Sequence, residues 1–376
     1  MTDPRRARRL QLSVRYVVRY AMLVIGLWSL YRAGPRPTVE WNEPTTYPPT
    51  VRIVASPLPD SLASLPAWFA GQERAAGVTD TAVAKRVVFA DSAQPAKTPW
   101  SVVYLHGFSA TRQETAPLSE DVARALGANL YETRLRGHGL PGDSLRNVQA
   151  GNWMNDAAFA LDVGRRLGDS VLVIGTSTGG TLGALLATLP KPVRQGLHAL
   201  VLISPNFGPK DPMAGLLTLP WAQSVLPRFI PDREWTAKND EQKRFWTTRY
   251  PSTALFPMQA LVEDVRDQPL TGYDVPTLVF YHEADEVVDA KRTTRWLDAL
   301  DAEGSVKSVR VLVAPISGED GHVLSGRIVS PTQTGAFRDR IVAFIRRRIG
   351  LVTAVTPAGA SVVDDRSEAG QTYDAG

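Results

Sequence analysis

Short apolar runs alternate with longer amphipathic segments between residues 86 and 348. The short runs are rich in β-branched residues and have the length of strands that are buried on both faces of a parallel sheet. They are Arg86–Ala90, Ser101–Leu105, Asn129–Thr133, Val171–Gly175, Ala199–Ile203, Thr277–Tyr281 and Ser308–Val313. Helical patterns lie between several of them, at Ser119–Leu126, Trp153–Leu167, Gly180–Leu189, Lys291–Ala302 and Thr334–Arg348. The alternation predicts an α/β fold with a mostly parallel central sheet and helices on both faces.

Three stretches depart from this alternation. Residues 206–270 contain several prolines and aromatic residues and require a separate interpretation. The Pro-rich stretch 35–60 is typical of an extended linker, which leaves 61–350 as the folded domain. Residues 351–376 are small and polar with scattered acids, which predicts a disordered tail.

The N-terminal 34 residues combine clustered arginines with a short apolar run. Arg5, Arg6, Arg8 and Arg9 precede the run at 20–31, YAMLVIGLWSLY, and Arg19 separates it from the apolar residues before it. Twelve residues are short for a membrane span, which needs about 20, but they suit the core of a signal peptide. A snorkelling arginine at the headgroups would extend the helix into a marginal span.

No small-residue cleavage site follows the apolar run, which favours an uncleaved signal-anchor over a signal peptide for residues 1–34. The clustered arginines would keep the N-terminus in the cytoplasm, so the favoured interpretation is a membrane-anchored protein with its body on the non-cytoplasmic side. A cleaved signal peptide on a secreted or periplasmic protein, or the start of a cytoplasmic protein, are the alternatives.

The amino-acid composition excludes several kinds of functional site. The chain has no cysteine, which excludes disulfides, zinc–thiolate sites, iron–sulfur clusters and cysteine nucleophiles. The net charge is +4, but the first 36 residues carry eight arginines against one acid, Asp3, so the remainder is mildly acidic at −3. The basic pI therefore gives no indication of a nucleic-acid partner. Nothing in the sequence indicates an oligomeric state.

A G-x-S-x-G motif stands where an apolar strand runs into a helix. Residues 171–180 read VLVIGTSTGG, with Ser177 between Gly175 and Gly179. A serine on a sharp strand-to-helix turn has a strained backbone, and side chains two residues away on either side would clash there. The helix N-terminus also favours negative charge beside the serine. The pattern predicts that Ser177 is a nucleophile.

An acyl-transfer serine needs two backbone N–H donors that face the tetrahedral oxyanion. We expect one from Thr178, which follows the nucleophile, and the other from Phe108, in the loop after the strand that ends in His106-Gly107. His106 itself is interpreted as a structural residue that braces this loop.

The acid and then the general base are expected, in that chain order, after the nucleophile. Of the five histidines, only His322 follows the last predicted strand, in the polar loop SGEDGHVLS. Asp285, in the turn after the strand at 277–281, is the preferred acid, because it would accept the imidazole N–H and fix the tautomer. Glu283, Glu286 and Asp289 compete for that role.

These segments together resemble the α/β-hydrolase superfamily, and within it the monoacylglycerol-lipase-like branch, also called the serine aminopeptidase-like hydrolases. The matching stretches are LHGF at 105–108, RLRGHG at 134–139, GTSTGG at 175–180, HEADEVV at 282–288 and GH at 321–322. The chain departs from that branch at Thr176 and Thr178, where His and often Met flank the serine, and at His282, where Gly is usual. These departures weaken any transfer of substrate specificity.

The resemblance implies an α/β-hydrolase fold with an inserted cap, and residues 206–270 occupy the place of the cap. Met213, Leu217 and Trp221 are the candidates for contact with an acyl chain, although they would equally suit packing of the cap onto the body. The expected activity is a serine hydrolase, carboxylesterase- or lipase-like, that cleaves acylglycerol-like or medium-chain esters without a metal or organic cofactor. A peptidase or amidase with the same triad is the alternative, and a non-catalytic binding protein is a third hypothesis.

Overall fold

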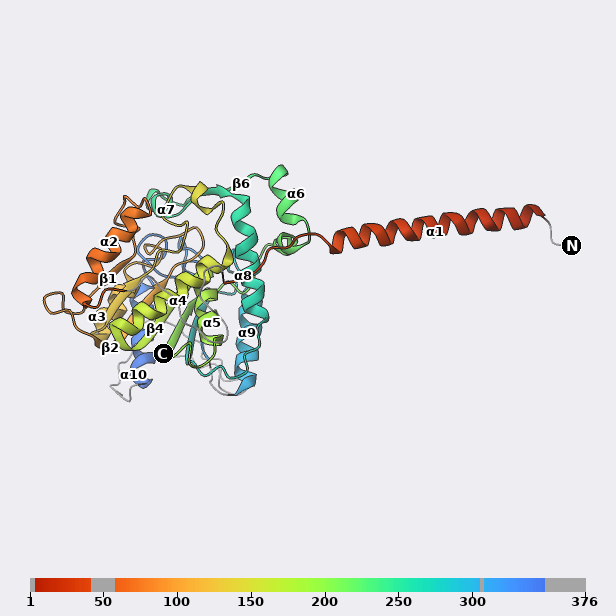
Figure 1. Ribbon diagram of the computed structural model, residues 1–376. Helices are drawn as coiled ribbons and strands as arrows, with labels where there is room; N and C mark the ends of the chain where they lie inside the picture. Colours follow the sequence, from red (N-terminus) through yellow and green to blue (C-terminus); the bar gives the residue numbers. More distant parts are fainter. Residues whose placement is uncertain (1–3, 42–57, 305–307, 349–376) are drawn as a thin grey trace.

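The computed structural model describes residues 4–41, 58–304 and 308–348, and Figure 1 shows the arrangement of its elements. All seven predicted strands form one sheet, in the order β1-β3-β2-β4-β5-β8-β9. The strands are β1 Arg86–Val88, β2 Thr98–Leu105, β3 Asn129–Glu132, β4 Gly168–Thr176, β5 Leu197–Ile203, β8 Thr277–Tyr281 and β9 Val309–Leu312. Only β1 pairs antiparallel, with β3, and every other neighbouring pair in this sheet is parallel. The predicted fold class is therefore confirmed.

Helices cover both faces because alternate side chains of each strand point to opposite sides of the sheet. Val103 and Val173 face a core shared with α2, α4, α5, α8 and α9, whereas Val102 and Leu172 face α3 and α10. The helices of the body are α2 Leu65–Ala75, α3 Leu118–Leu126, α4 Ala150–Leu167, α5 Thr178–Thr188, α8 Leu255–Asp267, α9 Ala290–Glu303 and α10 Thr334–Arg348. Of these, α2 and α8 lie outside the predicted helical segments.

The segment predicted to form a cap, residues 206–270, divides into a peripheral part and a core part. The peripheral part contains the 3-10 helix η3 Pro212–Thr218, the helices α6 Ala222–Phe229 and α7 Asp240–Phe245, and an antiparallel pair of short strands, β6 Asp232–Glu234 and β7 Arg249–Pro251. Figure 1 shows α6, β6 and α7 along one end of the sheet. The last helix, α8, buries Leu261, Val262 and Val265 in the main core beside α5.

The predicted membrane anchor, and with it the placement of the body on the far side of a membrane, is wrong. Across residues 4–41, 58–304 and 308–348, no helix combines the length and the apolar composition that crossing a membrane requires. Helix α1, Pro4–Arg32, extends away from the body in Figure 1, but Arg19 divides its apolar part. Its uninterrupted apolar run of twelve residues would span about 18 Å, against a hydrocarbon core of about 30 Å.

The end of α1 contacts the peripheral part of the cap. Trp221 Nε1 donates to the carbonyl oxygen of Leu30 at 3.0 Å, and Trp221 N donates to that of Pro35 at 2.9 Å. Most of the predicted linker, 42–57, and the whole predicted tail, 351–376, lie outside the described residues.

Candidate active site

Ser177 occupies the turn between β4 and α5 in a strained backbone conformation. Its φ of 52° and ψ of −117° are rare for a side chain with a Cβ atom, and such outliers gather at functional sites. Neighbouring backbone holds the turn on both sides, because Ser177 N donates to the oxygen of Ile203 at 2.9 Å and Asn206 N donates to that of Ser177 at 3.0 Å. The serine sits at the carboxyl end of a central strand, where ligands of open parallel sheets bind.

The two glycines of the motif are required for the reason predicted from the sequence. A Cβ atom on Gly179 would lie 2.0 Å from the Leu105 carbonyl oxygen, and one on Gly175 would lie 2.3 Å from that of Gly179. Each collision is with backbone, so no side-chain rotation relieves it. The close packing of α5 against β4 and β2 therefore depends on the absence of these side chains.

We accordingly expect Gly179→Ala to lower the free energy of unfolding by about 3 kcal/mol or more, because overpacking against backbone is relieved only by moving a strand or a helix. Gly71→Ala is the matched control, since Gly71 lies within α2 and a Cβ there meets no atom closer than 3.9 Å. Alanine at that helical position should stabilise the protein by about 0.5–1 kcal/mol. Urea unfolding of both variants measures the difference, and equal stabilities would contradict this account of the elbow.

His322 and Asp285 form a buried pair. His322 Nδ1 lies 2.8 Å from Asp285 Oδ2, and the side chain of Asp285 is 1% exposed. The second carboxylate oxygen, Oδ1, accepts the backbone N–H groups of Val287 at 2.8 Å and Val288 at 3.0 Å. These two bonds fix the carboxylate, so Nδ1 of His322 carries the proton that it donates and Nε2 is left as the acceptor.

The surrounding charges favour the protonated form of His322. Burial alone would lower the pKa of its imidazole, but the negative charge and hydrogen bond of Asp285 outweigh burial, and Asp320 and Glu114 add to them. The net result is a pKa above the usual value. Asp320 also fixes the loop, because its Oδ1 accepts the backbone N–H of His322 at 2.7 Å and its Oδ2 lies 2.8 Å from Lys238 Nζ of the cap.

The three carboxylates that competed with Asp285 lie elsewhere. Glu283 and Glu286 are exposed. Asp289 caps the N-terminus of α9, where it accepts the N–H of Lys291 at 3.0 Å. Among these four acids, Asp285 alone has a hydrogen bond with His322 in the structure.

The two expected oxyanion donors belong to residues that lie next to Ser177 in the chain or in space. Thr178 is the first residue of α5, and Phe108 follows Gly107, whose Cβ position would be 3.2 Å from Ser177 Cβ. In the described part of the chain, no backbone or side-chain acceptor takes either N–H group. The Phe108 ring packs edge-on against Tyr250, Trp153 and His138.

His106 braces the loop that carries Phe108, as interpreted from the sequence. Its Nδ1 lies 2.9 Å from the Gly107 carbonyl oxygen, and its Nε2 accepts the Leu135 N–H at 3.0 Å. This pattern defines a neutral imidazole with the proton on Nδ1, in agreement with burial that lowers the pKa of His106 well below its usual value.

Sheet order brings the candidate residues together. Ser177 follows β4, Asp285 follows β8 and His322 follows β9, and the order β4-β5-β8-β9 places all three at the carboxyl edge of the sheet. Residues 4–41, 58–304 and 308–348 show no hydrogen bond between Ser177 and His322, and such bonds in unliganded sites often tighten only with substrate. Catalytic roles for the three residues, and for Phe108 and Thr178, therefore stay predictions.

The candidate acyl-chain residues occupy the outer part of the cap. Met213 is 61% exposed, Leu217 is half-buried and Trp221 is 38% exposed and directed toward the end of α1. Their contact with substrate stays a prediction. Over the described ranges, no group of three or more His, Asp or Glu side chains is arranged to hold a metal ion.

Comparison with known proteins agrees with this architecture. The model of the alpha/beta hydrolase family matches residues 102–325, which include every element that carries the candidate site. A thermostable monoacylglycerol lipase of Bacillus sp. (strain H-257) is 25% identical over 190 residues, covering 50% of this chain and 72% of the relative. The chain belongs to the alpha/beta hydrolase family and is a hydrolase of the lipase and esterase kind.

Solved structures show the same fold. One, from work on the metagenome-derived lipolytic enzymes LipS and LipT, has a TM-score of 0.55 at 18% identity and covers 71% of this chain and 98% of its own. Another is a soluble variant of monoglyceride lipase from Saccharomyces cerevisiae in complex with a substrate analog. It has a TM-score of 0.50 at 11% identity, with 70% of this chain and 91% of that chain covered.

Proposed function

We propose that the protein hydrolyses carboxylic esters through a covalent acyl-enzyme formed on Ser177. His322 Nε2 takes the proton of the Ser177 hydroxyl as its oxygen attacks the ester carbonyl, and Asp285 holds the imidazole in the required tautomer. The N–H groups of Phe108 and Thr178 stabilise the oxyanion. The alcohol leaves with the proton from His322, and water then repeats the sequence on the acyl-enzyme.

The observation that carries the proposal is the hydrogen-bonded pair of Asp285 and His322, which lies at the same edge of the sheet as Ser177 with its strained backbone. Burial of the pair excludes water and strengthens its electrostatics. The proposed substrates are acylglycerol-like or medium-chain esters, which the likeness to a monoacylglycerol lipase supports. Exposed apolar side chains on the cap, such as Met213, Trp221 and Phe229, also suit an apolar substrate.

The test is labelling with a fluorophosphonate probe, followed by kinetics on p-nitrophenyl esters of rising chain length and on a monoacylglycerol. We expect labelling of the wild type and a kcat/KM optimum at medium chain length. Aminoacyl p-nitroanilides are assayed in parallel, and preferential cleavage of these amides would favour a peptidase over an esterase. Failure of folded wild-type protein to react with the probe or any substrate would refute the proposal.

A further inference from the structure

A second buried carboxyl group lies beside the candidate nucleophile, and the mechanism proposed above does not use it. Glu114 is 2% exposed and lies in the loop that follows β2. A Cβ atom placed on Gly107 would be 2.6 Å from Glu114 Oε1 and 3.2 Å from Ser177 Cβ. The carboxyl group and the serine therefore approach the same glycine.

One oxygen atom of Glu114 binds two parts of the site directly and a third through the Tyr104 hydroxyl. Its Oε2 accepts the Gly107 backbone N–H at 2.7 Å and lies 3.0 Å from the Tyr104 hydroxyl of β2. The same hydroxyl lies 3.2 Å from Oγ1 of Thr176, the residue before Ser177. A continuous set of hydrogen bonds thus joins the oxyanion loop, β2 and the nucleophile elbow.

The bond to Gly107 acts on the orientation of the next peptide unit. His106 Nδ1 donates to the Gly107 carbonyl oxygen at 2.9 Å, and Ala110 N donates to it at 3.3 Å. In a planar trans peptide the C=O and the following N–H point in opposite directions, so the direction of the Gly107 carbonyl sets that of the Phe108 N–H. Glu114 holds the N–H side of Gly107 while His106 holds its carbonyl side.

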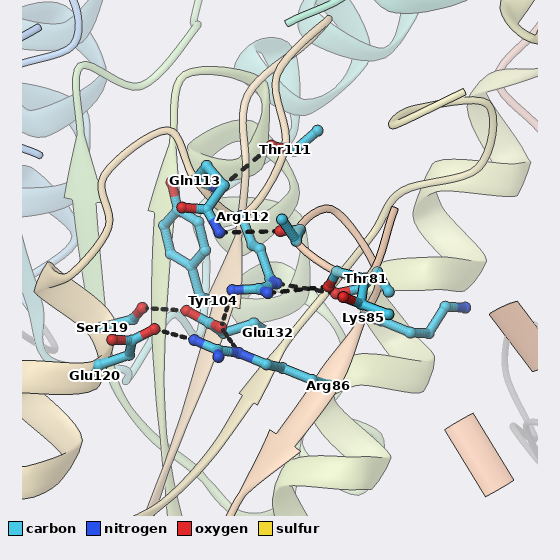
Figure 2. A network of polar contacts seen from close by, with 12 residues as sticks. Thr81, Lys85, Arg86, Tyr104, Thr111, Arg112, Gln113, Ser119, Glu120 and Glu132 are labelled. Carbon is cyan, nitrogen blue, oxygen red and sulfur yellow. Dashed lines mark hydrogen bonds and ion pairs between the residues drawn. The ribbon is translucent and has the colours of Figure 1, made fainter. Parts of the chain in front are cut away.

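The two residues before Glu114 bind segments outside the site, which explains why the Glu114 side chain is directed toward Gly107. Figure 2 shows Arg112 and Gln113 directed toward the 81–85 segment and β3. Arg112 Nε donates to the Ala84 oxygen at 3.0 Å, and its Nη1 lies 3.3 Å from Glu132 Oε2. Gln113 Nε2 donates to the Ala82 oxygen at 3.0 Å. Because the side chains of Arg112 and Gln113 are bound to these segments, the following residue, Glu114, is the one that extends into the site.

The charge of Glu114 is coupled to the site. Burial raises the pKa of its carboxyl to about 7, against the opposing effects of the Gly107 N–H, the charge of His322 and the Tyr104 hydroxyl, and Asp320 adds to the rise. In return, the Glu114 charge helps to raise the pKa of His322. The titratable groups that face Glu114 are thus Tyr104 on β2 and the pair His322 and Asp320 from the loop after β9.

We propose that Glu114 is a positioning residue of the acyl-transfer site, which holds the Gly107–Phe108 backbone so that the Phe108 N–H faces the developing oxyanion. The inference rests on the proposed esterase function of Ser177, and it assigns the residue no direct contact with substrate. It predicts an effect on the transition state rather than on substrate binding, because the oxyanion exists only after attack.

The test compares Glu114→Ala with Glu114→Gln in steady-state ester hydrolysis. Glu114→Ala should lower kcat about 10–100-fold with KM nearly unchanged, since misplacing one oxyanion donor costs somewhat less than the 10²–10³-fold seen on removing one. Glu114→Gln should recover most of this loss, because an amide oxygen accepts the same two hydrogen bonds. Glu120→Gln, which removes the charge of an α3 side chain that is paired with Arg86, should match the wild type.

A pH profile separates positioning from general structural support. Neutral His322 is the active form of the base, so activity rises with pH through its pKa. Glu114→Gln removes a negative charge that raises this pKa, and the midpoint of the acid limb should move to lower pH. Both variants are assayed at a temperature below their measured unfolding transitions.

Each result has a defined meaning. Wild-type kcat in Glu114→Ala, or equal losses in the Ala and Gln variants, would overturn the positioning role while leaving the esterase proposal intact. Absence of fluorophosphonate labelling in the wild type would instead remove the esterase proposal itself. If Glu114→Ala does not fold, Tyr104→Phe takes its place, since it removes one of the two donors to the same oxygen and should lower kcat by a smaller factor.

Discussion

Ser177→Ala should reduce kcat for an activated ester by about 10⁶-fold, because the proposed mechanism has no other nucleophile to form the acyl-enzyme. Any remaining rate would come from the oxyanion donors and from substrate binding, which together leave about 10³–10⁴-fold acceleration over water in enzymes of this type. Fluorophosphonate labelling should disappear in the same variant. The measurement is kcat on p-nitrophenyl esters, with labelling read on a gel.

A matched control separates the hydroxyl from the strained backbone. Ser204 follows the neighbouring strand β5 and is 1% exposed with a φ of 43°, so like Ser177 it is a buried serine with a positive φ. Ser204→Ala should keep labelling and activity, because nothing in the proposed mechanism uses its hydroxyl. A Ser177→Ala protein that retains more than about one per cent of the wild-type rate would move the nucleophile elsewhere.

The central sheet was predictable from the sequence because its strands are local, apolar and β-branched. A parallel strand that is covered on both faces reads as a continuous apolar run. The bounds of all seven predicted strands lie within a few residues of those in the structure. The elbow was predictable for a different reason. A Cβ atom on either glycine would lie 2.0 Å or 2.3 Å from a backbone oxygen, so only glycine fits there and the sequence motif reports the packing directly.

What the sequence did not reveal depends on contacts between distant segments. Glu114 carries no motif, and its importance arises only when the fold brings Tyr104 and Gly107 to one carboxylate. Helix α8 was hidden in the Pro- and aromatic-rich cap, although its apolar residues are buried in the main core. The anchor prediction failed because it gave the apolar run more weight than Arg19, which shortens that run below a membrane span.

The acid of the pair had to be chosen among four carboxylates within seven residues, and only the backbone geometry distinguishes them. Asp285 is held by the N–H groups of Val287 and Val288, which leaves its second oxygen directed at His322. An aspartate in an unrestrained loop would have left the tautomer of the imidazole undefined. The turn after β8 thus contributes to the site through its backbone as well as its carboxylate.

This arrangement makes Asp285→Asn a sharp test. The two backbone donors should bind the amide oxygen of the new side chain, so its NH₂ group faces His322 Nδ1. The imidazole must then accept at Nδ1 and carry its proton on Nε2, where it cannot take the proton of Ser177. We expect kcat to fall by about 10⁴-fold while the fold is retained, since shape and the backbone hydrogen bonds are preserved.

Glu286→Gln is the matched control, because Glu286 is next to Asp285 in the chain, is exposed, and loses the same negative charge on substitution. It should change kcat less than about threefold, as expected for an exposed charge that is largely screened by solvent. Thermal unfolding of both variants establishes that the fold is intact. A larger loss of kcat in Glu286→Gln than in Asp285→Asn would mean that Glu286, and not Asp285, is the acid. Equal small losses would mean that His322 needs no carboxylate partner to act as the base.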